Sequence, residues 1–293
     1  MPLDIKEREG PTAPTDVLKM RSLLQQAADA GRWTVDPPSK EIFHHSIRLL
    51  SFGTPSVSKC LILHLHGGGF RAGSPETSSH FAKRISQNCQ VTVLCPGYRL
   101  APEHPFPSGL LDCRKVLQYA VQQHPDLPVI LSGDSAGGGL AASLALLAAE
   151  HKIPIAGVIL LSPWLDLRLV ASTFQSNATS DKLFSYQTAR LAADFYLQGT
   201  SPENPYVSPL LADLSRFPPT LLCTGDIEVL VEDSRAFANT LQHHNVDVRY
   251  HEISGMGHTA VIRDITATGA EQTAGEIESF INAFLAGDSF FLA

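Results

Sequence analysis

Residues 129–150 have the sequence VILSGDSAGGGLAASLALLAAE, and this stretch decides the fold. Its first part, residues 129–131, is a short apolar run typical of a strand that is buried on both faces. Its last part, residues 136–150, is rich in alanine and leucine, which favour a helix. Between them, glycines let the chain turn sharply and present Ser135 at the start of the helix. The stretch therefore predicts a strand, a tight turn that carries a serine, and a helix.

Short apolar runs and helical patterns alternate on both sides of this unit. Further strands are expected at residues 42–52, 61–66, 91–95, 155–161, 220–223 and 246–253. Further helices are expected at residues 76–87, 110–123, 232–244 and 271–285. Alternation of this kind predicts an α/β fold with a mostly parallel, doubly wound sheet that is flanked by helices.

Two segments fall outside this alternation. Residues 15–31 predict a helix that Gly31 can end. Residues 166–214 form a connection far longer than is usual between such elements, and residues 185–197 within it are amphipathic. The candidate apolar contacts of that amphipathic stretch are Leu191, Phe195 and Tyr196. The long connection is either a packed surface excursion or, as we favour, a lid over the carboxyl ends of the strands, where open α/β sheets bind ligands.

Composition narrows the possible partners. The 293-residue chain contains 44% hydrophobic residues, which is enough apolar material for one large core. It carries 22 lysines and arginines against 29 aspartates and glutamates, and its formal charge is −7. A mildly acidic chain without a basic run has no electrostatic attraction to nucleic acid or to an anionic membrane, so we expect neither as a partner. No segment approaches the roughly 20 apolar residues of a membrane span.

The cysteines and the first residues bear on location. The chain has five cysteines, an odd number, and their spacing fits neither a disulfide framework nor a zinc site. Three of them stand in apolar, strand-like runs, where a free thiol behaves as a small hydrophobic side chain. Residues 1–10 are polar and charged and lack the apolar stretch of a signal peptide. These features predict a reducing, cytoplasmic setting and no bound metal.

A serine nucleophile needs a general base, an acid that orients the base, and donors for a developing oxyanion. Residues 66–70, His-Gly-Gly-Gly-Phe, directly follow a predicted strand, and their glycines let backbone N–H groups face a ligand. The alternative is a phosphate-binding glycine loop, but neither a following lysine nor a dinucleotide fingerprint supports it. The two glycine motifs together favour acyl transfer at Ser135. The expected oxyanion-hole donors are the N–H groups of Gly68, Gly69 and Ala136, next to His66 and Gly67 of the motif.

Twelve histidines compete for the role of the base. His258 stands in a Gly-Met-Gly-His loop between the last predicted strand and the last predicted helix, where a flexible loop can reach the serine. His66 already belongs to the glycine loop, and the adjacent pairs at 44–45 and 243–244 stand in polar settings typical of a surface. We therefore expect His258 to be the base.

The acid is open between two carboxylates. The predicted strand at 220–223 runs into Thr-Gly-Asp-Ile-Glu, so Asp226 and Glu228 both follow the strand end, where the orienting partner of the histidine belongs. Asp233 lies further on, within a predicted helix, and is a weaker candidate. The chemistry of the side chains alone does not separate Asp226 from Glu228.

Four motifs resemble the hormone-sensitive-lipase-like branch of the α/β-hydrolases, which contains bacterial and fungal carboxylesterases. They are HGGGF at 66–70, YRLAPEHPFP at 98–107, GDSAGG at 133–138 and SPW at 162–164. Their combination is highly specific, and the resemblance spans residues 61–258. It implies the α/β-hydrolase fold with a helical cap. It also implies a serine carboxylesterase that acts on small esters with short acyl chains and needs no metal or organic cofactor.

The resemblance also assigns parts of the chain. It implies cap helices within residues 1–40, a catalytic domain over residues 41–293, and a cap insertion at about 166–214. An ungapped match of the acid loop puts the catalytic carboxylate on Glu228, with Asp226 as the fallback. Relatives often pair through a sheet edge, so a homodimer stays open.

Two further points follow from the resemblance. Arg99 and Glu103 would organise the loop beneath the oxyanion strand. Only one strand is expected before residue 61, at 42–52, where the family usually has two.

Three rivals remain. A thioesterase, an amidase or a lactonase would use the same machinery, and only the pocket would distinguish them. A non-catalytic small-molecule receptor on the same fold would lack a member of the triad, whereas this chain has a candidate for each. A scaffold or interaction protein would not need this constellation of residues.

Overall fold

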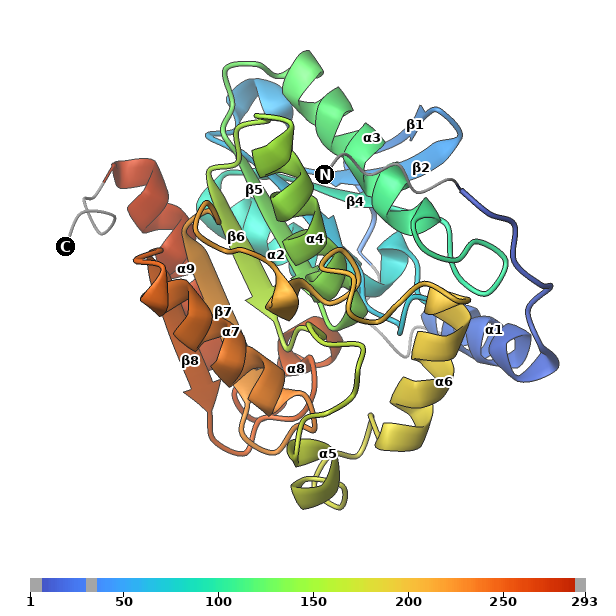
Figure 1. The fold of residues 1–293 in the computed structure, drawn as a ribbon. Helices are drawn as coiled ribbons and strands as arrows, with labels where there is room; N and C mark the ends of the chain where they lie inside the picture. The colour runs from blue at the N-terminus through green and yellow to red at the C-terminus, as the bar shows by residue number, and fades with distance from the viewer. Residues whose placement is uncertain (1–6, 30–35, 288–293) are drawn as a thin grey trace.

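The computed structural model describes residues 7–29 and 36–287 of the chain. Its strands are β1 (Lys40–His44), β2 (Ile47–Phe52), β3 (Leu61–Leu65), β4 (Thr92–Pro96), β5 (Val129–Asp134), β6 (Gly157–Leu161), β7 (Thr220–Gly225) and β8 (Val248–Ile253). They form one sheet in the order β1-β2-β4-β3-β5-β6-β7-β8 (Figure 1). β4, β3 and β5 to β8 are parallel to one another, whereas β1–β2 and β2–β4 are antiparallel pairs. The predicted mostly parallel sheet is confirmed.

The edge of the sheet near the N-terminus differs from the sequence prediction. The single strand predicted over residues 42–52 is wrong, because β1 and β2 form a hairpin there. His45 and Ser46 connect the two strands with φ angles of 44° and 66°. A two-residue hairpin turn of this kind needs positive φ at both positions and usually carries Asn-Gly or Asp-Gly. Because a His-Ser pair is not a typical turn sequence, the turn is not recognisable in a segment that otherwise has the pattern of a strand.

Helices cover both faces of the sheet (Figure 1). The helices of one face are α2 (Ser79–Cys89) and α9 (Ala270–Ala286), and those of the other are α3 (Ser108–Gln123), α4 (Ala136–Glu150) and α7 (Val231–His243). Each face buries its own apolar core, as expected of a doubly wound sheet. Within the described residues, no helix combines the length and the apolarity that crossing a bilayer would require.

The central strands supply both cores because successive side chains of a strand point to opposite faces. Val129 and Leu131 of β5 belong to the core that contains α3, α4 and α7, while Ile130 belongs to the core that contains α2 and α9. Trp164, directly after β6, is fully buried in the first of these cores. Burial on both faces explains why these strands are continuously apolar.

The remaining elements belong to neither of the two helix layers on the sheet. They are α1 (Thr15–Asp29), α5 (Thr173–Ser176), α6 (Tyr186–Leu197), α8 (Ala260–Arg263) and the 3₁₀ turns η1 (Pro55–Val57), η2 (Pro75–Ser78) and η3 (Pro209–Leu211). The amphipathic helix predicted at 185–197 is confirmed as α6, and Ser185 caps it. Tyr196 stacks on Phe70, with ring centroids 3.9 Å apart. The apolar contact predicted for Leu191 is wrong, because this side chain is 38% exposed. The predicted helix end at Gly31 lies outside the described residues.

Arg21 holds α1 against the loop that follows β4. Its guanidinium donates to both carboxylate oxygens of Glu103, at 2.7 and 2.9 Å, and to the carbonyls of Ala101 and Arg71. Glu103 therefore connects the N-terminal helix to this loop. Arg99, from the same loop, instead pairs with Asp112 of α3 at 2.8 Å.

Asp233 is a buried carboxyl group in the first turn of α7. Its Oδ2 accepts from the N–H groups of Leu165 and Asp166, which fixes the loop after β6. Burial and the neighbouring charge of Asp166 raise the pKa of Asp233 to about 8. The folded protein therefore holds a proton here that an unfolded chain would release near pH 4.

This proton predicts a pH-dependent effect of Asp233→Asn. Since the pKa is raised on folding, the contribution of Asp233 to stability falls as the pH rises from about 4 to about 8. Asparagine can still accept both N–H bonds and has no proton to lose. We expect the melting temperature of Asp233→Asn, relative to wild type, to rise steadily over this range. Asp126→Asn, at an exposed aspartate, is the control, and an equal pH trend in both variants would contradict the prediction.

Candidate active site

The carboxyl ends of the parallel strands meet at one edge of the sheet, and the loops that leave this edge carry the predicted site residues. β3 leads into the glycine loop at 66–70, β5 into Ser135, β7 into Asp226 and Glu228, and β8 into His258. The sheet thus brings together residues that are far apart in the sequence.

Ser135 occupies the turn between β5 and α4. Its φ of 53° and ψ of −122° are rarely adopted by a residue with a side chain. The N–H of Ser135 donates to the carbonyl of Leu161 at 3.0 Å, and its carbonyl accepts from the N–H of Trp164 at 2.9 Å. These bonds to the end of β6 hold the strained turn in the position from which the Oγ atom reaches His258.

Three side chains form a hydrogen-bonded row at this edge. Nε2 of His258 lies 2.9 Å from Oγ of Ser135, and Nδ1 of His258 lies 2.7 Å from Oε2 of Glu228. Ser135 and His258 are nearly buried, and Glu228 is fully buried. Because a carboxylate only accepts, a neutral imidazole here carries its proton on Nδ1 and leaves Nε2 to accept from the serine hydroxyl.

The two carboxylates of the β7 loop have separate partners. Oε1 of Glu228 accepts from the hydroxyl of Ser162 at 2.7 Å and from the N–H of Gly225 at 2.5 Å, so both of its oxygens are engaged. Asp226 instead accepts from the hydroxyl of Ser254 and the N–H of Gly255, in the loop after β8. The structure therefore puts Glu228, and not Asp226, against the imidazole of His258.

The surroundings of His258 favour its protonated form. Burial by itself lowers the pKa of His258, but the hydrogen bond and the charge of Glu228 outweigh burial and raise it. Phe184 lies parallel to the imidazole, with ring centroids 5.7 Å apart, and limits the orientations of the ring. His258 is thus held by Glu228 on one side and by a segment of the long connection on the other.

The side chains of Tyr98 and Asp134 hold the glycine loop in place. The rings of His66 and Tyr98 stack with centroids 4.3 Å apart, and the hydroxyl of Tyr98 donates to the carbonyl of His66 at 2.5 Å. Burial lowers the pKa of His66 to about 4, so the imidazole is neutral at pH 7. The N–H of Gly67 donates to Oδ1 of Asp134 at 2.9 Å, which ties the loop to the residue before Ser135.

The three expected oxyanion donors belong to the glycine loop and to the start of α4. Gly68 and Gly69 have φ angles of +119° and +62° and line the same pocket as Ser135. Ala136 follows the serine as the first residue of α4. Of the residues that the sequence assigned to this site, the fallback acid Asp226 is the one that the structure directs elsewhere.

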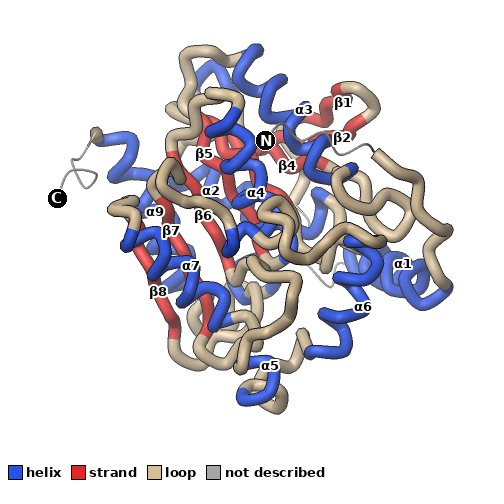
Figure 2. The backbone as a smooth tube through the Cα atoms, viewed as in Figure 1, coloured by secondary structure: helices blue, strands red, loops and turns tan. Residues whose placement is uncertain are grey.

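A pocket of about 350 Å³ opens onto Ser135 and His258. α1 contributes Met20 and Leu24, and the segment before and within α6 contributes Leu183, Phe184 and Thr188. Figure 2 shows α1 and α6 at the same end of the molecule, beyond the strands. The remaining lining residues are Gly67, Gly68, Gly69, Arg71, Ala72, Gly73, Thr77, Asp134, Thr259, Ile262 and Arg263.

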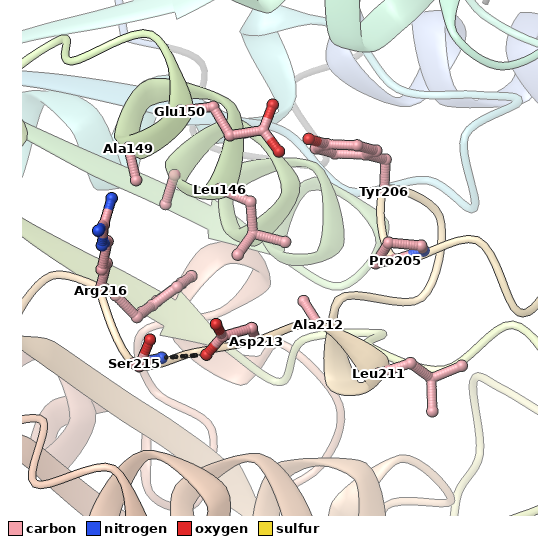
Figure 3. Close-up of a pocket in the computed structure, with 12 residues that line it drawn as sticks. Leu146, Ala149, Glu150, Pro205, Tyr206, Leu211, Ala212, Asp213, Ser215 and Arg216 are labelled. Carbon is pink, nitrogen blue, oxygen red and sulfur yellow. Dashed lines mark hydrogen bonds between the residues drawn. The ribbon is translucent and has the colours of Figure 1, made fainter. Parts of the chain in front are cut away.

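A second pocket, of about 440 Å³, lies against the C-terminal half of α4 and residues 205–217 (Figure 3). Its ionisable groups are those of Glu150, Tyr206, Asp213 and Arg216, and Asp213 accepts from the N–H of Ser215 at 2.9 Å. Its lining residues include no histidine, so Ser215 has no general base of the expected kind there. The larger cavity is therefore not the candidate active site.

Three further residues, to which the sequence gave no role, support the site. Ser162 stands within the SPW motif, and its hydroxyl donates to Glu228. Oδ2 of Asp181 accepts from the N–H of Val229 at 3.0 Å, and its Oδ1 accepts from the N–H of Phe184 at 3.0 Å. Asp181 thus joins the acid loop to the ring that stacks on the histidine. No sequence pattern distinguishes Asp181 or Phe184 within the long connection, so the sequence could not identify either residue.

The site contains no cluster of metal ligands: in the part of the chain that the structure describes, no three His, Cys, Asp or Glu side chains come together as a metal would require.

Comparisons with known proteins agree with this fold. The model of a family described as alpha/beta hydrolase fold matches residues 62–262. An esterase of Acinetobacter venetianus is 34% identical over 223 residues, which cover 75% of this chain and 74% of the relative. An acetyl-hydrolase of Streptomyces hygroscopicus is 34% identical over 200 residues, or 67% of each protein. A solved esterase from the bacterial hormone-sensitive lipase family has a TM-score of 0.85 at 28% identity, and 94% of this chain matches 93% of that one.

The close contact between α4 and β3 gives a prediction about stability. A Cβ atom at Gly137 would lie 2.0 Å from the carbonyl oxygen of Leu65, so Gly137→Ala must displace backbone. We expect a loss of about 2–3 kcal/mol in the free energy of unfolding, measured in urea. Gly275→Ala in α9 is the matched control, because no atom of the described residues beyond the adjoining backbone of its own helix lies within 4 Å of the added Cβ. It should stabilise by up to about 1 kcal/mol, and an equal loss in both variants would refute the steric argument.

Proposed function

The chain belongs to the α/β hydrolase family and is a carboxylic ester hydrolase of its hormone-sensitive-lipase-like branch, and on this premise we propose that Ser135, His258 and Glu228 form the catalytic triad. The observation that carries the proposal is the row of two hydrogen bonds, 2.9 Å and 2.7 Å long, that joins the three side chains. A nucleophile, a base and an acid that orients the base are the parts that nucleophilic acyl transfer requires.

In the proposed first half-reaction, Oγ of Ser135 attacks the carbonyl carbon of the ester while Nε2 of His258 takes the hydroxyl proton. The imidazolium that forms is stabilised by the carboxylate of Glu228, which already accepts from Nδ1. His258 then donates the proton to the leaving alcohol, and the acyl group stays on Ser135. Water repeats the sequence on this acyl-enzyme and releases the acid.

We propose the N–H groups of Gly68, Gly69 and Ala136 as the oxyanion hole. The positive φ of both glycines and the position of Ala136 at the start of α4 support this role. Losing one donor of this type typically lowers turnover by about 100- to 1,000-fold. Every step uses groups of this chain, so the proposed mechanism requires no metal or organic cofactor.

We further propose that the segments around α1 and α6, within residues 1–40 and 166–214, form a cap over the catalytic domain at 41–293. Both segments line the pocket at Ser135, and a pocket of about 350 Å³ suits esters with short acyl chains. Thioesters, amides and lactones could react by the same chemistry, and a panel of such substrates would separate them from simple esters.

The cytoplasm is the location we propose, and the five cysteines, all of them buried free thiols, support a reducing compartment. We also propose that two copies would pair through an edge of the sheet, which β1 and β8 form. Light scattering after size exclusion would test the dimer.

Three substitutions test the triad. With a short p-nitrophenyl ester, Ser135→Ala and Glu228→Ala should each lower kcat/KM by about 1,000-fold or more, because each removes a member of one proton-transfer unit. Asp226→Ala is the matched control on the same loop and should stay within about tenfold of wild type. If Asp226→Ala loses activity and Glu228→Ala keeps it, the acid is assigned wrongly. If Ser135→Ala keeps wild-type activity, the proposed nucleophile is wrong.

The dependence of kcat/KM on pH provides a separate test. Only neutral His258 can accept the serine proton, and Glu228 raises its pKa, so activity should be lost as the pH falls through a value above the ordinary histidine pKa of about 6.5. Glu228→Gln removes the charge that raises the pKa. The acidic limb of its residual activity should therefore shift to lower pH. An unshifted limb would show that Glu228 does not control the protonation of His258.

A further inference from the structure

Arg71 is a buried cation in the wall of the catalytic pocket. It follows the glycine loop directly, and only 9% of the residue is exposed. Its Nε atom lies 3.7 Å from the place where a Cβ atom would stand on Gly69, one of the proposed oxyanion glycines. Arg71 therefore borders the space in which an ester bound at Ser135 must lie.

The guanidinium of Arg71 lacks a partner among the described residues: it makes neither a hydrogen bond nor an ion pair there. Its own carbonyl accepts from Arg21, which fixes the backbone but leaves the side chain free. The carboxylate of Asp16 on α1 attracts Arg71 from beyond ion-pair distance. By contrast, seven other arginines pair with carboxylates: Arg21, Arg48, Arg84, Arg99, Arg168, Arg190 and Arg235.

Most of Arg71 is covered, but none of its nitrogens is among the fully buried polar atoms that lack a partner, so the guanidinium meets the solvent of the pocket. Burial lowers the pKa of Arg71, yet a guanidinium stays protonated at any physiological pH. An anion that enters the pocket can therefore reach this charge directly and form charge-assisted hydrogen bonds with it. A buried charge of this kind at a cleft is typical of a binding function.

Arg263, at the end of α8, lines another part of the same pocket and is exposed to solvent. In the described part of the chain it too forms no ion pair. Asp134 and Asp181 attract it from a distance, but both carboxylates already accept from backbone N–H groups. Among the described lining residues, the pocket therefore presents two cations, while the single carboxylate, that of Asp134, is engaged with the glycine loop.

We propose that the pocket is built for carboxylic esters that carry a second, anionic group, a carboxylate, which Arg71 binds with the help of Arg263. This inference rests on the proposed function and specifies its substrate class. A guanidinium binds a carboxylate through two parallel N–H···O bonds, and such charge-assisted bonds are among the strongest in proteins. The anion would supply the partner that Arg71 lacks within the described chain.

The test compares two substrates with the same six-carbon acyl chain: mono-p-nitrophenyl adipate, which ends in a carboxylate, and p-nitrophenyl hexanoate, which is neutral. We expect wild type to have a kcat/KM for the adipate about tenfold or more above that for the hexanoate, mainly through KM. Arg71→Met should lower the ratio of the two values by about tenfold or more, and Arg263→Met should lower it less. Because the ratio compares two substrates on one variant, general damage to the enzyme cancels.

Matched controls separate the subsite from bulk charge. Lys59→Met removes an exposed cation before β3, at the opposite end of the strand from the glycine loop, and should leave the ratio unchanged. Arg71→Lys keeps the charge but lacks the guanidinium that can donate two parallel hydrogen bonds, so its ratio should lie between those of wild type and Arg71→Met. Added salt should lower the wild-type ratio, because it screens attraction to the anion.

A second pair of substrates locates the anion on the alcohol side: p-carboxyphenyl butyrate against its neutral carboxamide. A preference that depends on Arg71 in either pair supports the inference and identifies the part of the ester that carries the charge. If neither pair shows a ratio that falls in Arg71→Met, the inference is wrong.

Binding to Ser135→Ala keeps this result distinct from failure of the proposed function. By calorimetry, monoethyl adipate should bind Ser135→Ala at least about tenfold more tightly than diethyl adipate, and the added Arg71→Met should abolish the difference. A wild type that hydrolyses neutral esters without any charge preference refutes the subsite alone. A wild type that hydrolyses no ester refutes the proposed function, and the binding comparison still decides the anion subsite.

Discussion

The site depends on how closely α4 approaches the end of β3. A Cβ atom at Gly133 would lie 2.2 Å from the carbonyl oxygen of Gly137, and one at Gly137 would lie 2.0 Å from that of Leu65. Only residues without side chains allow the helix to begin so near the strand. This approach forces Ser135 into its strained turn and sets the start of α4 beside the glycine loop. The positions of the nucleophile and of the proposed oxyanion donors are thus consequences of one steric constraint.

A second theme is the treatment of buried charge. Glu228 and Asp181 are buried carboxylates that accept hydrogen bonds from backbone N–H groups, whereas the buried Asp233 accepts such bonds while it holds a proton. Each of the two carboxylates therefore holds backbone in place and is compensated in return. Arg71 is buried to a similar degree without such compensation among the described residues. The contrast separates charges that build the scaffold from a charge that faces the pocket.

Sequence patterns predicted the α/β fold well, because strands buried on both faces and alternating with helices leave few arrangements open. The sequence did not predict the hairpin of β1 and β2, because His45 and Ser46 adopt positive φ without the glycine or asparagine that is typical of such a turn. Leu191 was assigned to the apolar face of α6 and is exposed, because helical spacing does not show how wide the buried stripe is. Both misses arise where tertiary packing overrides a local signal.

By itself, the sequence determined the alternation of strands and helices after residue 61, the turn at Ser135, the glycine loop and the late histidine, because each depends on local backbone preferences. The chemistry of the side chains left Asp226 and Glu228 equivalent, and a resemblance was needed to prefer one. Only the tertiary structure decided which of the two carboxylates lies against His258, since that depends on the direction in which each side chain leaves the turn after β7. Tertiary structure alone also revealed Ser162, Asp181 and Arg71, because contacts between loops far apart in the chain leave no pattern in one sequence.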